Sequence, residues 1–313
     1  LQPAGFSLAG GLKPAAPQKP FRAMFPVVPP TGRFAPSPTG PLHLGSLVAA
    51  VASWLFARAA NGRWLVRIED IDTPRVVRGS AEDILGALQR YGLEWDGEVV
   101  WQSRRTHLYE AALQRLRDAK LVYDCACSRA DLQRAASAPL GAEAVYPGWC
   151  RNGLAEGKVA RAVRFHAPDQ NIAFDDLLCG RIEEHVSSRT GDFVVRRADG
   201  LFAYQLAVLV DDAEQGVTQV VRGVDLLDST ARQIALQRAL GYPTPEYAHV
   251  RLVVNADGAK LGKRDGALPL PTLDESRIRE TLAAALQHLG IDGIDAATPR
   301  EMLEAALAAF RRR

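Results

Sequence analysis

A histidine and two glycines lie close together in residues 35–46, APSPTGPLHLGS, between a predicted strand and a predicted helix. The start of a helix exposes unpaired N–H groups and a partial positive charge, and both favour phosphate. Gly40 and Gly45 let backbone or ligand approach closely, and the ring of His43 at the helix start can donate to a phosphate oxygen. This pattern predicts a phosphate site. The alternative is a turn that merely begins a helix.

A second candidate phosphate site is the basic loop of residues 257–266, DGAKLGKRDG, which carries Lys260, Lys263 and Arg264 between glycines. Such a loop can close over a triphosphate and neutralise the charge that develops when pyrophosphate leaves. The alternative is a solvated basic turn, which this composition alone would favour.

Three of the four cysteines, Cys125, Cys127 and Cys150, are grouped in the sequence. Three thiolates and one oxygen or nitrogen donor complete a tetrahedral zinc shell, and no histidine lies between Cys127 and Cys150. The alternative is three small buried thiols. Cys179 stands apart and is expected in the core.

The spacing of apolar residues predicts the elements that position these motifs. A strand at residues 32–35, a helix at 44–60 and a strand at 64–68 form a βαβ unit, which predicts a parallel sheet. Further helices are predicted at 80–91, 106–119, 230–240, 275–289 and 299–310. Ser80 is expected to cap the first of these, and Gly241 to end the third.

The remaining pattern predicts how the chain is divided. Residues 1–30 are rich in proline and are read as a flexible leader. The parts that follow are 31–119, the first half of a sheet domain; 120–190, an insertion with the cysteines; 191–250, the second half; and 251–313, the basic loop and a helical region. Residues 193–195 and 206–210 are expected to return to the main sheet as β structure and a buried apolar segment, and 217–221 as another strand.

The composition is that of an ordinary globular chain of 313 residues, with 47% hydrophobic and 24% charged residues. The net charge of +2 neither requires nor excludes nucleic acid, because a local basic face can exist within a balanced total. There is no run of about 18 apolar residues and no secretory signal, so we expect a cytoplasmic protein without a membrane partner.

The two phosphate motifs together resemble the signature pair of the class I aminoacyl-tRNA synthetases, most closely the glutamate-specific members. HLGS at 43–46 is similar to their first motif and KLGKR at 260–264 to their mobile second loop. The resemblance also includes RFAPSPTG at 33–40, RIEDID at 67–72, AYQLA at 203–207, DD at 211–212 and VRGVDLL at 221–227. It implies an α/β, Rossmann-like catalytic core with an inserted zinc-binding subdomain and a short C-terminal helical region. Gly262 departs from the usual serine, which removes one hydroxyl contact to the nucleotide.

The resemblance implies an ATP-dependent enzyme that activates glutamate as an adenylate, with Mg²⁺ accompanying ATP. His43 and Lys263 are then the catalytic residues. The nucleotide would be bound by Pro36, Ser37, His43, Gly45, Ser46, Lys260 and Lys263. The α-carboxylate of glutamate would attack the α-phosphorus, and positioning and electrostatic stabilisation would accelerate the step without a protein nucleophile.

A glutamate site needs a cation for the side-chain carboxylate and an anion for the ammonium group. Arg33 and Arg222 are the candidate cations, Glu69 is the candidate anion, and Tyr204 can supply a hydroxyl group. The resemblance adds Ala35 and Ser37. Open α/β sheets bind ligands beyond the carboxyl ends of their strands, where these side chains are expected. The alternatives are a structural Glu69–Arg67 ion pair and a core tyrosine.

The resemblance also supplies the fourth zinc ligand, Tyr146, which joins Cys125, Cys127 and Cys150 around a structural Zn²⁺. Only 50 residues follow Lys263, too few for the anticodon-binding region of a full glutamyl-tRNA synthetase. The chain thus resembles those members that load glutamate onto the queuosine base of tRNA(Asp), and a monomer is expected. Two alternatives stay open: a truncated synthetase that esterifies the tRNA 3′ end, and a non-catalytic RNA-binding paralogue.

Overall fold

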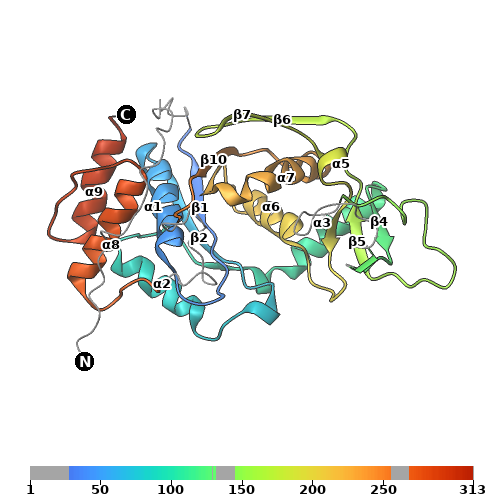
Figure 1. Cartoon of the computed structure of the whole chain (residues 1–313), viewed down its shortest axis with the longest axis horizontal. Coiled ribbons are helices and arrows are strands. Elements are labelled where there is room, and N and C mark those ends of the chain that lie inside the picture. The colour runs from blue at the N-terminus through green and yellow to red at the C-terminus, as the bar shows by residue number, and fades with distance from the viewer. Residues whose placement is uncertain (1–27, 129, 132–144, 255–267, 313) are drawn as a thin grey trace.

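The computed structural model describes residues 28–128, 130–131, 145–254 and 268–312 (Figure 1). Within these residues a seven-stranded sheet forms the centre of the molecule, in the order β3-β2-β1-β9-β10-β6-β7. All neighbouring strands are parallel except β6 and β7, which are antiparallel. The strands are β1 (Thr31–Phe34), β2 (Arg63–Ile68), β3 (Val100–Trp101), β6 (Asn171–Asp176), β7 (Gly180–His185), β9 (Gln219–Gly223) and β10 (Glu246–Val250).

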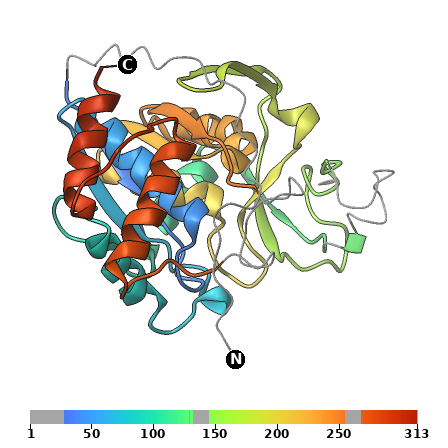
Figure 2. The same cartoon turned by 60° about the vertical axis from the view of Figure 1, so that its left-hand side comes forward.

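Helices cover both faces of this sheet, as a parallel sheet requires (Figures 1 and 2). On one face lie α1 (Leu44–Ala59), α2 (Ser80–Arg90), α8 (Glu275–His288) and α9 (Pro299–Phe310). On the other lie α3 (Thr106–Asp118), α6 (Tyr204–Glu214) and α7 (Leu227–Leu240). Short helical turns occur at η1 (Thr73–Arg75), η2 (Gln102–Arg104), η3 (Val224–Leu226) and α5 (Val186–Arg189).

Successive side chains of a strand point to opposite faces, and this alternation separates the apolar and the charged residues of the sheet. Val221 and Ala248 pack under α1, in the core between the sheet and the helices α1, α2, α8 and α9. Their neighbours Arg222 and His249 face α6 and α7, and the two are paired in the β9–β10 register. The face under α6 and α7 therefore carries buried charge that the other face lacks among the described strands.

The predicted βαβ unit is confirmed: β1 and β2 are parallel and α1 connects them. Gly241 ends α7 in the left-handed conformation at φ 67°, as predicted. Helix α9 begins at Thr298, which forms a capping box with Glu301.

The prediction that Ser80 caps α2 is wrong. Gly79 holds the N-cap position at φ 81°, and Ser80 is the first helical residue. Its hydroxyl instead accepts a hydrogen bond of 2.9 Å from the backbone N–H of Gly40. The start of α2 therefore fixes the turn that precedes α1.

A separate antiparallel sheet, in the order β4-β5-β8, lies at the opposite end of the molecule from α8 and α9 (Figure 1). Its strands are β4 (Val122–Cys125), β5 (Ala162–Phe165) and β8 (Phe193–Arg196). The expectation that residues 193–195 return to the main sheet is wrong, because β8 pairs with β5. Residues 206–210 are buried, as expected, but they belong to α6 and do not enter the main sheet.

Residues 120–190 do not all leave the main sheet. Strand β6 pairs with β10 at Asp176 and Tyr247, so the β6–β7 hairpin extends the main sheet. Only β4 and β5 of this stretch belong to the small sheet, together with β8.

Among the described helices, none is long and apolar enough to cross a bilayer.

Candidate active site

The predicted phosphate corner joins β1 to α1. Residues 35–43 leave the carboxyl end of β1, and His43 is the N-cap of α1 with an extended backbone. The imidazole Nε2 of His43 lies 3.2 Å from the hydroxyl oxygen of Ser46, one helical turn away. The backbone N–H of Glu69 donates to the carbonyl of Pro36 at 2.9 Å, which holds the segment after β2 beside this corner. Gly40 adopts φ 122°, a conformation that favours glycine.

The second motif, with Lys260 and Lys263, lies outside the described residues. Leu270 follows it in the sequence, and its N–H donates to the carbonyl of Leu42 at 2.9 Å. The chain after the basic loop is therefore anchored next to His43.

A buried ionic network connects β1, β2 and α6. The guanidinium of Arg67 contacts Asp212 at 2.8 Å and Glu69 at 3.1 Å. Asp212 also pairs with the Nε of Arg33 at 3.2 Å. Charges so deeply buried persist only when each has partners. The Arg67–Glu69 pair that the sequence offered as an alternative to substrate binding is thus present.

The second acidic residue of α6, Asp211, anchors the outer side of this network. Its carboxylate accepts hydrogen bonds from Arg105 at 2.6 Å, Tyr109 at 2.7 Å and Gln102 at 2.8 Å. It also lies 3.7 Å from the Nε of Arg67. Helix α3 and the turn before it are therefore tied through Asp211 to the same arginine that contacts Glu69.

The network shifts the pKa values of its carboxyl groups in opposite directions. Burial opposes ionisation of Asp212, but the positive charges of Arg33 and Arg67 outweigh it and lower its pKa. Burial raises the pKa of Glu69, although Arg67 and Arg33 oppose this. The carboxyl group of Asp212 is therefore held in its ionised form, and Glu69 would gain from a further cation such as an ammonium group.

We expect Asp212→Asn to lower the free energy of unfolding by about 3 kcal/mol at pH 7, because the buried charge of Arg33 would lose its partner. The folded-state pKa of Asp212 is lowered, so its contribution is complete above the unfolded value and is lost as the pH falls; the deficit should shrink below about pH 4. Urea denaturation measures it. Asp199→Asn is the control, since the Asp199–Arg197 pair is exposed and should contribute less than about 1 kcal/mol. Equal losses in the two variants would contradict the assignment.

Arg222 is the centre of a second buried group, between β9, α6 and α7. Its five N–H donors all have acceptors, and none of these is a carboxylate. They are Gln233 at 2.8 Å, Thr230 at 2.8 Å, His249 at 3.1 Å, the hydroxyl of Tyr204 at 3.2 Å and the carbonyl of Leu226 at 3.3 Å. Arg222 is 5% exposed, so its positive charge is both buried and without a direct counterion among the described residues.

The structure brings Arg222 and Tyr204 together, and it joins Arg33 and Glu69 through Arg67 and Asp212. The two groups are neighbours because β1 pairs with β9. The charge of Arg33 acts on both, since it contributes to the pKa shifts of Glu69 and of His249. Ala35, Pro36 and Ser37 follow β1 directly, while Gly45 and Ser46 lie in the first turn of α1. The roles of these residues stay predictions.

Several residues of the site were given no role by the sequence. Thr230, Gln233 and His249 surround Arg222, and Asp211 and Asp212 organise the other group. A doublet of acidic residues in an apolar segment was the available signal for the last two, because buried carboxylates need cationic partners. Nothing in the sequence alone distinguishes Thr230 or Gln233 from ordinary helical residues.

Asp70 and Asp72, the two aspartates that follow β2, have structural partners. Asp70 accepts hydrogen bonds from the backbone and hydroxyl of Ser103 at 2.8 and 2.6 Å. Asp72 pairs with Arg75 at 2.6 Å and with Arg197 at 3.3 Å. These contacts indicate that both residues stabilise the local structure after β2.

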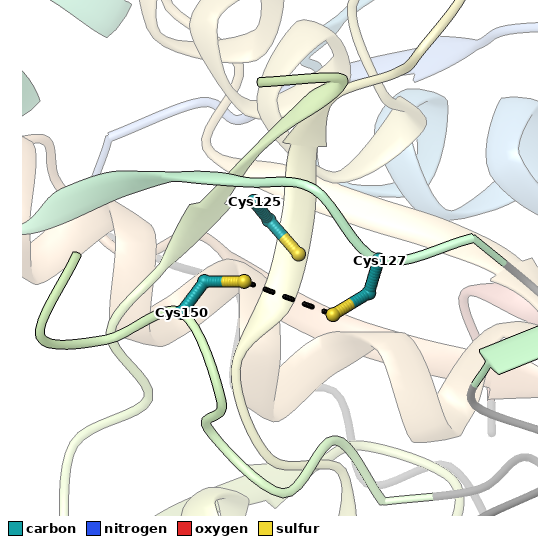
Figure 3. A group of neighbouring side chains, drawn as sticks. All are labelled: Cys125, Cys127 and Cys150. Atoms are coloured by element: carbon teal, nitrogen blue, oxygen red, sulfur yellow. Dashed lines mark hydrogen bonds between the residues drawn. The ribbon is translucent and has the colours of Figure 1, made fainter. Parts of the chain in front are cut away.

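The three grouped cysteines converge at the end of β4, with their side chains pointing toward one another (Figure 3). The sulfurs of Cys127 and Cys150 are 3.7 Å apart. The phenol oxygen of Tyr146 lies 3.5 Å from the sulfur of Cys125 and 3.7 Å from that of Cys127. Cys179, predicted to be a core residue, is exposed and lies elsewhere, near the backbone of His249.

This spacing fits a tetrahedral metal site. Bonds of about 2.3 Å from zinc to sulfur and about 2.0 Å to oxygen place two sulfurs roughly 3.8 Å apart, and a sulfur and an oxygen about 3.5 Å apart. The sulfurs of Cys127 and Cys150 are 3.7 Å apart, all three sulfurs lie within 4.8 Å of one another, and the phenol oxygen lies 3.5 and 3.7 Å from two of them. The donors are therefore compatible with zinc.

The fold and the corner around His43 define a class I aminoacyl-tRNA synthetase catalytic core. Residues 31–305 match the family of tRNA synthetases class I (E and Q), catalytic domain, and the chain belongs to this family. Among curated relatives it is similar to the Glutamyl-Q tRNA(Asp) synthetase of Geobacter sulfurreducens, with 57% identity over 270 residues, 85% of this chain and 86% of that protein. The protein of the same name from Verminephrobacter eiseniae is 51% identical over 290 residues, 90% of this chain and 97% of its own length.

A solved structure of similar fold is a glutamate tRNA ligase from Elizabethkingia meningosepticum in complex with its amino acid. It has a TM-score of 0.72 and 29% identity, and the match covers 88% of this chain. The chain spans only 64% of that ligase. The structural similarity is therefore limited to that part of the ligase.

Proposed function

We propose that this protein activates L-glutamate with ATP as glutamyl-adenylate and transfers the glutamyl group to the queuosine base of tRNA(Asp). The observation that carries the proposal is the 51–58% identity to relatives named Glutamyl-Q tRNA(Asp) synthetase, over 83–90% of the chain. The arrangement around Arg222 supports the choice of an acidic substrate.

Arg222 suits the side-chain carboxylate of glutamate because its charge is buried and not neutralised. Its three bonds to Gln233, Thr230 and His249 are buried, whereas those to Tyr204 and Leu226 are longer and only partly buried. A carboxylate can take the place of the longer contacts and receive two parallel N–H bonds. The Nε2 of Gln233 has no partner among the described residues, and it too can donate to a carboxylate.

The ammonium group of glutamate would then face Glu69, whose raised pKa reflects burial that a cation would offset. This orientation directs the α-carboxylate toward the corner that carries His43. An oxygen of that carboxylate attacks the α-phosphorus of ATP, a new C–O–P linkage forms, and the bond to pyrophosphate breaks. Magnesium accompanies ATP and neutralises phosphate charge.

His43 and the start of α1 would bind the phosphates, and Lys260 and Lys263 would stabilise the leaving pyrophosphate. Leu270 is seven residues after Lys263 and is anchored beside His43. Seven extended residues span at most about 25 Å, so the second motif is tethered near the first. This tether favours the prediction that both motifs serve one nucleotide.

We also propose that Cys125, Cys127, Cys150 and Tyr146 hold a structural zinc ion. The fit of their distances to a tetrahedron supports this, and the ion would connect β4 to the segment with Cys150. Zinc there would order the small sheet and take no part in the reaction. The cytoplasmic location and the monomeric state stay predictions.

Mass spectrometry of tRNA(Asp) after incubation with glutamate and ATP tests the function. We expect a glutamyl mass increase on the queuosine nucleoside and none on tRNA(Asp) that lacks queuosine. Glutamylation of the 3′ terminal adenosine, independent of queuosine, would indicate instead a truncated synthetase. Absence of both products and of glutamate-dependent ATP–pyrophosphate exchange would indicate the non-catalytic paralogue.

A further inference from the structure

A chain of three buried side chains leads from Arg222 to the edge of the main sheet. The Nε of Arg222 lies 3.1 Å from Nε2 of His249, and Nδ1 of His249 lies 2.5 Å from Oδ2 of Asp176. The three residues belong to β9, β10 and β6, which are consecutive in the sheet. All three are at most 5% exposed.

The direction of these hydrogen bonds fixes the tautomer of His249. A guanidinium only donates, so Nε2 of His249 must accept, and the ring proton is then on Nδ1, facing the carboxylate. Asp176 is itself anchored, because its Oδ1 accepts from the backbone N–H groups of Leu178 and Cys179 at 3.0 and 2.8 Å. The acceptor presented to Arg222 is therefore set by Asp176.

The neutral imidazole separates the two charges. Where a carboxylate touches a guanidinium directly, as Asp212 touches Arg33 at 3.2 Å, it neutralises the cation that a ligand would need. With His249 between them, Asp176 orients the guanidinium of Arg222 without occupying it. The positive charge stays available to an acidic side chain.

We propose that His249, held by Asp176 in the Nδ1–H tautomer, is the positioning residue that presents the guanidinium of Arg222 to the side-chain carboxylate of the substrate. The inference rests on the proposed function, since it assumes that this carboxylate is that of glutamate. It makes the affinity for glutamate depend on a residue that does not contact glutamate.

Protonation of His249 would put an N–H group opposite the N–H of Arg222. The charged and titratable groups around the ring are Asp176 of β6, Arg222 of β9, Arg33 of β1 and the stacked Tyr247 of β10. Burial lowers the pKa of His249 despite the hydrogen bond to Asp176, so the ring is neutral at pH 7. Because the folded-state pKa is below about 6.5, glutamate binding should weaken only as the pH falls below that value.

Asp176→Asn is the first test, because the amide can donate where the carboxylate accepted. Nδ1 then becomes the acceptor, the ring proton moves to Nε2, and it opposes Arg222. We expect the KM for glutamate in ATP–pyrophosphate exchange to rise 10- to 100-fold, the range typical when a residue that orients a ligand-binding side chain is lost. The KM for ATP should stay within about two-fold of wild type, which a general loss of structure would not produce.

His249→Gln is the conservative partner, since its amide can donate to Asp176 and accept from Arg222 without titrating. It should keep the KM for glutamate near that of wild type at pH 7.5, and it should lack the rise that protonation of His249 gives wild type at acidic pH. His249→Leu, which lacks an acceptor, should resemble Asp176→Asn.

The outcomes separate the inference from the function on which it rests. Wild-type protein without glutamate-dependent exchange would overturn the proposed function and the inference together. Wild-type exchange with an unchanged KM for glutamate in folded Asp176→Asn would overturn the inference alone. Should Asp176→Asn not fold, His249→Leu and His249→Gln decide, and an unchanged KM for glutamate in folded His249→Leu would overturn the inference.

Discussion

Arg222→Ala is expected to lower kcat/KM for glutamate in ATP–pyrophosphate exchange by roughly 100-fold to several thousand-fold. The range corresponds to the loss of about 3–5 kcal/mol when one partner of a buried charge pair is removed. The effect is large because, among the described residues, the other candidate cation for the glutamate side chain, Arg33, is already paired with Asp212. Arg222→Lys keeps the charge but loses the planar fork, so it should recover only part of the activity.

Arg181→Ala is the matched control for this experiment. Arg181 lies on β7, pairs with Asp175 at 2.9 Å, and has a side chain that is 61% exposed. Its removal should leave kcat/KM within about two-fold of wild type, because exposed pairs contribute little. Thermal unfolding should show that both variants are folded. If folded Arg222→Ala retained wild-type exchange, the glutamate site would have to lie elsewhere.

The sheet and most helices follow from local pattern. Apolar residues recur at helical spacing across α1, and β2 is a short apolar run, in which Trp64 and Val66 pack on one face of the sheet and Leu65 on the other. Both signals are readable without knowledge of the fold. The rule that ligands lie beyond the carboxyl ends of parallel strands then brought Arg33, Glu69 and Arg222 to one region.

The errors have physical reasons. The apolar run at residues 206–210 is buried on all sides, and such a run cannot be assigned to helix or strand by periodicity. The pairing of β6 with β10, and of β8 with β5, joins segments distant in sequence, and local residues do not encode such pairings. The insertion predicted at residues 120–190 was therefore one continuous stretch of the chain. In the structure, β6 and β7 of that stretch belong to the main sheet, and β8, which follows it, belongs to the small sheet.

The part of the site that could be predicted from the sequence is the part that the charges of its residues indicate. Arginines and a glutamate in a motif suggest a substrate carboxylate and ammonium group, but the sequence does not show which arginine is already neutralised. Asp212 neutralises Arg33, whereas Asp176 reaches Arg222 only through His249. That difference depends on side-chain contacts between strands and helices. Among the described residues it leaves Arg222, and not Arg33, without a direct carboxylate partner.

Protein purified without chelators should contain one equivalent of zinc, and Cys127→Ala should lose it. Structural zinc contributes apparent free energies of about 10–16 kcal/mol in small domains, so loss of the ion should unfold the region around β4 while the main sheet, which has its own cores, stays folded. Elemental analysis by mass spectrometry measures the zinc. Limited proteolysis should then show new cleavage near residues 145–161.

Cys179→Ala serves as the control, since Cys179 is exposed and is separate from the cluster. It should retain the full zinc content and the wild-type cleavage pattern. Wild-type protein free of zinc, or full zinc content in Cys127→Ala, would show that this cluster does not hold zinc.

Tyr146 decides whether the fourth donor is an oxygen of this chain. Its phenol oxygen accepts a hydrogen bond of 3.0 Å from the N–H of Cys150, and the guanidinium of Arg164 lies over its ring at 3.9 Å. Arg164 also donates to the sulfur of Cys125 at 3.3 Å. Both contacts stabilise negative charge on the donors, as ligation by thiolates and a phenolate requires.

Tyr146→Phe removes only that oxygen and keeps the ring under Arg164, so it isolates the contribution of the bond to zinc. We expect the variant to fold and to bind zinc, but to release it to a competing chelator at least ten-fold faster than wild type, because water would replace a held ligand. Equal release rates would show that the oxygen is not a ligand and that three thiolates hold the ion with a donor from outside this group. Faster release with an unchanged cysteine cluster would place the phenol oxygen in the first coordination shell, where its distances of 3.5 and 3.7 Å from two of the sulfurs already fit.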